Sequence, residues 1–70
     1  MNAQEKLLEE IERVIRLRSN YEELRGLPNV VVEPQIMMMN ASINSAKAAA
    51  ASGDGVEVIR ALNDLDGWQE

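Results

Sequence analysis

The chain has 70 residues, no cysteine and no histidine, and its 12 acidic and 7 basic side chains give a formal net charge of −5. Hydrophobic residues make up 46% of the sequence, which is enough for a folded domain. The missing cysteines exclude disulfides and cysteine-based zinc sites, and the missing histidine removes the commonest general base and metal ligand. We therefore expect one helical domain over residues 1–70, no enzyme activity and no cofactor.

The acidic balance argues against nucleic acid and anionic membrane surfaces as partners, because both are bound through clustered Lys and Arg side chains. No apolar run approaches the roughly 20 residues of a membrane span. Residues 1–5 lack the basic-then-apolar order of a signal peptide. We therefore expect a cytoplasmic protein that binds no nucleic acid and no membrane.

Residues 2–25 are predicted to form one long helix. Asn2 has the residue type of an N-cap, and Glu5 follows at the spacing of a capping box. Apolar residues recur every three or four positions, and Leu8 and Ile15 widen the apolar arc to about half of the helix circumference. An apolar arc this wide predicts that the helix contacts two neighbouring elements.

Residues 27–33 are predicted to be an extended connection. Gly26 is the expected stop of the first helix, in the left-handed conformation. Three consecutive valines at 30–32 favour extended backbone. Because one short strand cannot form a sheet within this chain, the segment either covers the core or pairs, through Val31, with a second copy.

Residues 34–52 and 54–66 are predicted to form a helical hairpin, which completes a small all-α three-helix bundle. Pro34 suits the first turn of a helix, and Gly67 is the expected C-terminal stop, after which Trp68 folds back on the last helix at Leu62 or Leu65. One face of each helix is apolar: Ile36, Met39, Ile43, Ala46 and Ala50 in the first, and Val58, Ile59, Ala61, Leu62 and Leu65 in the second.

Neither a metal site nor a catalytic group is predicted. A calcium loop around residues 52–55 would place Ala50 and Ala61 at ligand positions. The serine hydroxyls have no histidine to activate them. The carboxylates of the first helix are expected in ion pairs at i,i+4 spacing, such as Glu9 with Arg13.

Arg18 lies near the centre of the apolar arc of the first helix. An arginine there is expected to pair with Glu22 or to extend its charged end to the solvent. The alternative is an anion site inside the bundle or at an oligomer interface. The candidate anion-binding residues are Arg18, Tyr21, Arg25, Asn40 and Lys47.

The run Met37-Met38-Met39 is also unusual, because consecutive residues on a helix point in three directions. One methionine can serve the core, and the other two need a partner or stay exposed. Methionine is adaptable and suits binding surfaces. The candidate protein-interface residues are Leu8, Ile15, Val31, Met37 and Met38.

A core of this size rarely supplies more than about 3–5 kcal/mol, so we expect a homo-oligomer, most simply a two-fold dimer. The favoured function is a non-enzymatic, small acidic interaction module that binds and blocks, or scaffolds, another protein. This composition is typical of small acidic inhibitors, including those of phages and mobile elements. The alternatives are an oligomeric binder of a small anionic ligand such as a nucleotide, and a structural assembly component, for instance of a virion.

Overall fold

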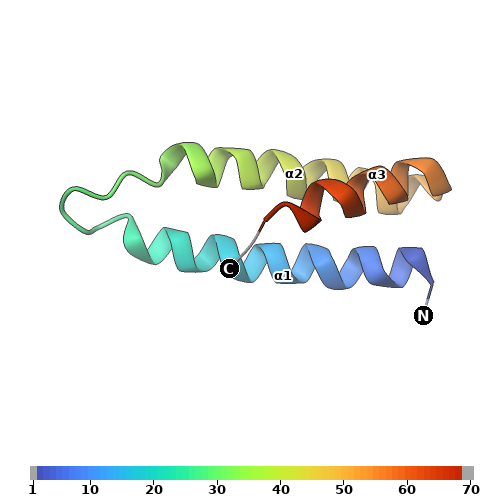
Figure 1. The fold of residues 1–70 in the computed structure, drawn as a ribbon, viewed down its shortest axis with the longest axis horizontal. Helices are drawn as coiled ribbons and strands as arrows, with labels where there is room; N and C mark the ends of the chain where they lie inside the picture. The colour runs from blue at the N-terminus through green and yellow to red at the C-terminus, as the bar shows by residue number, and fades with distance from the viewer. Residues whose placement is uncertain (1, 69–70) are drawn as a thin grey trace.

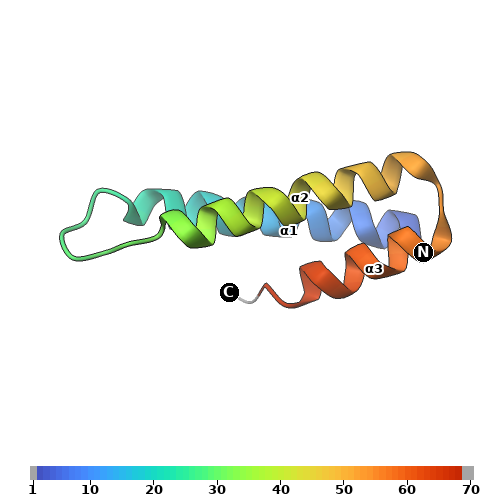
Figure 2. The same cartoon turned by 90° about the horizontal axis from the view of Figure 1, so that it is seen from above.

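A computed structural model describes residues 2–68, which contain the helices α1 (Ala3–Leu24), α2 (Glu33–Ser52) and α3 (Gly55–Asp66). Helices α1 and α2 run antiparallel side by side, and α3 turns back along them (Figure 1). This is the predicted all-α arrangement of a long helix, a connection and a helical hairpin. Figure 2 shows that α3 lies along the part of the pair that contains the start of α1 and the end of α2.

The helix starts follow their capping residues. The side chain of Asn2 accepts a hydrogen bond of 2.8 Å from the backbone N–H of Glu5. Asp54 accepts from the N–H groups of Val56 and Glu57, at 2.9 and 3.3 Å. These bonds satisfy backbone donors that have no partner within the helix. The predicted boundaries of α1 and α3 therefore differ from the observed ones only by the capping residues.

The prediction that Gly26 adopts the left-handed conformation is wrong. Within residues 2–68, the positive φ angles are those of Asn29 (64°) and Gly53 (70°). Helix α1 instead ends on Arg25 in a right-handed conformation, and its N–H donates to the carbonyl of Glu22. The positive φ of this connection lies three residues after Gly26, at Asn29, a residue type that tolerates it.

The valine segment covers one end of the core. Helix α2 begins one residue earlier than predicted, at Glu33, and Val32 precedes it in a right-handed conformation without a side-chain cap. Val32 is 5% exposed, whereas Val31 is 74% exposed. The expectation that this segment covers the core is confirmed for Val32.

The core lies along the axis between the three helices. Its members are Leu7, Ile11, Val14, Leu17, Met39, Ile43, Ala46, Ala49, Val58, Ala61 and Leu65, and Ile36 is buried beside Val32. The predicted inner face of α3 was too wide, because Ile59 is exposed. Successive helical residues are about 100° apart, so burial of Val58 turns Ile59 outward. In α2, Ala49 is buried more deeply than the predicted Ala50.

Candidate functional site

Arg13 joins α1 to the C-terminal end of α3. Its Nη1 donates to the Trp68 carbonyl at 2.6 Å, and its Nη2 donates to the Leu65 carbonyl at 2.9 Å. Its Nε pairs with Glu10 at 2.5 Å, so the expected pair with Glu9 is wrong. Glu9 and Glu10 precede Arg13 by four and three residues, and both are its neighbours on the helix surface, but the guanidinium turns toward Glu10.

Glu10 lies between two cations. Its carboxylate pairs with Arg13 on one side and with Lys6, at 3.2 Å, on the other. The hydrogen bond from Arg13 lowers the pKa of Glu10 from its ordinary value of 4.5, and this effect exceeds the opposing effect of burial. The carboxylate therefore stays ionised where it contacts Arg13.

Trp68 docks against the bundle, as predicted. The half-buried indole packs on the core, and its Nε1 donates to Ser42 Oγ at 3.2 Å. The Trp68 backbone N–H donates to the Leu65 carbonyl at 3.0 Å. The residue therefore bridges the end of α3 to the middle of α2.

A groove follows the junction of α2 and α3. It consists of three hollows of about 360, 450 and 390 Å³. The first shares Ala41, Ser42 and Asp64 with the second. It shares Ser45, Ala49 and Glu57 with the third. We call this feature the α2–α3 groove. Its α2 wall consists of Met38, Ala41, Ser42, Ser45, Ala48, Ala49 and Ser52.

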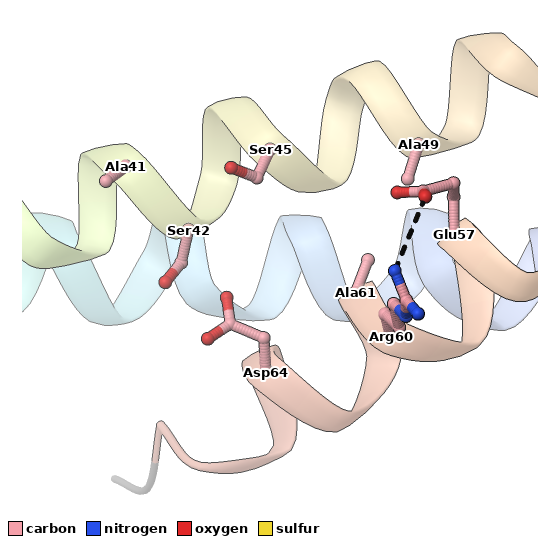
Figure 3. A pocket seen from close by; sticks show the side chains of 8 residues that line it. All are labelled: Ala41, Ser42, Ser45, Ala49, Glu57, Arg60, Ala61 and Asp64. Atoms are coloured by element: carbon pink, nitrogen blue, oxygen red, sulfur yellow. Dashed lines mark ion pairs between the residues drawn. The ribbon is translucent and has the colours of Figure 1, made fainter.

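The opposite wall of the α2–α3 groove is charged. Glu57 and Arg60 form an ion pair of 3.8 Å, and Asp64 points across the groove toward Ser42 (Figure 3). Trp68 lines the groove at its Met38 end. The groove thus has an uncharged wall of small side chains, a charged rim and an apolar end. Sequence periodicity missed it, because the fold of α3 against α2 creates it.

The proposed anion-binding residues are distributed along the bundle. Arg18 Nη1 donates to Asn40 Oδ1 at 2.7 Å, and Arg18 Nε lies 3.5 Å from Glu22 Oε1. Arg25 pairs with Glu33 across the connection, at 2.8 Å. Lys47 is exposed and seven residues beyond Asn40, a rise of about 10 Å along α2. The structure therefore brings Arg18 and Asn40 together, and Arg18 has the predicted ion pair with Glu22. Tyr21 is half-buried against the core.

Four of the predicted interface residues are largely exposed: Leu8 (52%), Val31 (74%), Met37 (71%) and Met38 (61%). Ile15 is half-buried and packs against the core. Further exposed apolar side chains, outside the predicted interface residues, are those of Leu24, Leu27, Val56 and Ile59. A substantial apolar surface therefore remains outside the core.

Among residues 2–68, the acidic side chains form no group of three that could hold a metal ion. In the same part of the chain, no helix has the length and apolar character needed to cross a membrane. The fold defines a small three-helix all-α protein. Comparisons with models of protein families, with curated proteins and with solved structures gave no match.

Proposed function

We propose that the chain is a non-enzymatic interaction module that assembles with copies of itself and binds another protein, which it blocks or scaffolds. The observation that supports this proposal is the number of large apolar side chains outside the core. Single exposed apolar residues are normal on protein surfaces, whereas contiguous apolar patches mark contact sites. Met37 and Met38 are adjacent and both more than half exposed.

The surroundings of the two methionines also support an interface. Helix α2 has no charged residue between Glu33 and Lys47, so Met37 and Met38 lie within an uncharged stretch of helix. Solvent-facing helix surfaces are ordinarily rich in charged side chains. Methionine adapts its shape to a partner, which suits it to a contact surface.

The double variant Met37→Lys, Met38→Lys tests this function. We expect it to lose self-association in sedimentation experiments, because two ammonium groups would have to be buried at the contact. Helix content by circular dichroism should stay the same, since Met and Lys have similar helix propensities. The matched control is Gln35→Lys, Ala51→Lys, which adds the same two charges at exposed positions of the same helix.

The partner protein requires a separate measurement. Native mass spectrometry of the protein isolated from its host should show a second polypeptide at fixed stoichiometry, and the double methionine variant should lose it. Self-association that equals wild type in the double variant would overturn the role of these residues. A homo-oligomer with no second polypeptide would overturn the protein-binding part and favour a structural assembly component.

One observation favours the second candidate function, the binding of a small anion. Arg18 and Asn40 lie together, and the buried Nε of Arg18 has the ion pair with Glu22 at 3.5 Å but no hydrogen bond. Thermal-shift measurements with phosphate and nucleotides, on wild type and on Arg18→Leu, separate the two functions. Our proposal predicts no shift. A shift of wild type that Arg18→Leu abolishes would establish the anion site, and saturation at a hundredfold excess over Kd adds about 2.7 kcal/mol.

A further inference from the structure

We infer that α2 of a second copy docks along the α2–α3 groove, antiparallel to the first α2, with the two-fold axis passing beside Ser45. This inference rests on the proposed self-association and specifies its geometry. Three observations carry it: the distribution of charge, the spacing of the exposed residues of α2, and the concave shape of the surface.

Charge is distributed unevenly over the three helices. Ten of the 22 residues of α1 and four of the 12 residues of α3 are charged, whereas α2 has Glu33 and Lys47 among 20 residues. Each copy has a formal net charge of −5, so two copies repel one another. Contact through the uncharged face of α2 brings no like charges together, which contact through α1 would do.

The exposed residues of α2 that line the groove have the spacing of a helix–helix seam. They are Met38, Ala41, Ser45, Ala48 and Ser52, and the intervals between them are 3, 4, 3 and 4 residues. Alternating intervals of three and four residues keep side chains on one line along a helix. All five are solvent-exposed, so this line is separate from the core face of α2.

A two-fold axis beside Ser45 makes this seam complementary to itself. Met38 lies seven residues before Ser45 and Ser52 lies seven residues after it. In an antiparallel pair, Met38 of one copy therefore faces Ser52 of the other, a large side chain against a small one. Ala41 of one copy faces Ala48 and Ala49 of the other, and the two Ser45 residues face each other. Such self-complementarity is what a two-fold interface requires.

The shape of the surface fits a helix. The adjoining hollows extend along α2 from Met38 to Ser52, a length of about 21 Å at 1.5 Å per residue. The charged rim of α3, at Glu57, Arg60 and Asp64, would face uncharged residues of the second α2. A helix about 10 Å wide that contacts this groove over about 21 Å covers much less than the roughly 800 Å² per partner of standard interfaces, so we expect weak dimerisation.

Cysteine crosslinking tests the register, and the chain has no cysteine of its own. Ser45→Cys should form a disulfide-linked dimer on mild oxidation, because the two-fold axis brings both copies of position 45 within bonding distance. Ala41→Cys mixed with Ala48→Cys should form more heterodimer than either forms homodimer. The control is Glu12→Cys on the exposed face of α1, which should crosslink at the collision rate.

A bulky substitution in the groove tests the same surface without oxidation. Ser45→Arg should reduce the association constant at least tenfold, while Ala51→Arg, an exposed position of α2 outside the groove, should leave it within twofold of wild type. Arginine favours helix, so neither change should alter helix content. A wild-type chain that stays monomeric would overturn the proposed self-association. A wild-type dimer that survives Ser45→Arg, with no enhanced Ser45→Cys crosslinking, would overturn only this geometry.

Discussion

Arg13 and Trp68 lie 55 residues apart, and the guanidinium of Arg13 donates a 2.6 Å hydrogen bond to the Trp68 carbonyl oxygen. The same guanidinium holds the Leu65 carbonyl and is itself held by Glu10. The last carbonyls of a helix have no partner within that helix. Arg13 therefore caps α3 from α1 and fixes the helix that forms the charged wall of the α2–α3 groove.

Arg13→Met should destabilise the protein by about 1–2 kcal/mol. The substitution keeps apolar volume but removes three charge-assisted hydrogen bonds, to Glu10, Leu65 and Trp68. Such bonds are worth about 1.5–3 kcal/mol each in buried sites and less at this partly exposed one. Urea denaturation followed by circular dichroism measures the change. The exposed Arg16→Met is the control, and equal effects of the two variants would contradict the capping role.

Trp68→Ala should cost about 1–3 kcal/mol, because it uncovers core that the indole covers. Trp68 is the chain's one tryptophan, so its fluorescence reports this site alone. We expect native emission shifted to the blue of the emission in denaturant. Ser42→Ala removes the acceptor of the indole N–H and should have a smaller effect. Native emission at the wavelength of the denatured protein would contradict the docking.

The long-range role of Arg13 shows what sequence periodicity can and cannot predict. Apolar spacing predicted the three helices and most of the core, because the burial of a helix face depends on local order. The partners of Arg13 depend on where α3 ends relative to α1, which is a tertiary relationship. The i,i+4 spacing favours Glu9 as the partner of Arg13, whereas the guanidinium pairs with Glu10 at i,i+3, because side-chain direction selects between neighbouring carboxylates.

The free energy of unfolding should decrease at acid pH, and protonation of Glu10 should account for part of this decrease. The folded pKa of Glu10 is depressed, so its contribution is present above its ordinary pKa of 4.5 and is lost as the pH falls through the lower folded value. The difference in unfolding free energy between wild type and Glu10→Gln should therefore shrink as the pH falls below 4.5 and through the lower folded pKa of Glu10. The control is the exposed Glu9→Gln. A difference that does not change with pH would contradict this assignment.

Gly53 and Gly26 should respond in opposite ways to alanine. Gly53 has a φ of 70°, so Gly53→Ala should cost about 1 kcal/mol. Gly26 lies outside the left-handed region, and an added Cβ would meet no atom within 4 Å. Gly26→Ala should therefore be neutral or stabilising by up to about 1 kcal/mol. Thermal unfolding of both variants measures this, and a larger loss at Gly26 would contradict the observed end of α1.

The candidate surfaces were only partly predictable from the sequence. Met37 and Met38 stood out because consecutive helical residues cannot all face one core. The α2–α3 groove cannot be predicted from the sequence. Its α2 wall consists of ordinary Ala and Ser residues, which line a groove only because α3 packs beside them. Arg18 and Asn40 are both predicted anion-binding residues, and they form a hydrogen bond. Lys47, predicted with them, lies about two turns further along α2.

Sedimentation equilibrium of the wild-type chain, from micromolar to millimolar concentration, tests whether the chain self-associates. We expect a mass that rises from one copy toward two, and a thermal midpoint that rises with concentration because assembly and folding are linked by mass action. A well-folded monomer at every concentration, with a constant midpoint, would contradict it.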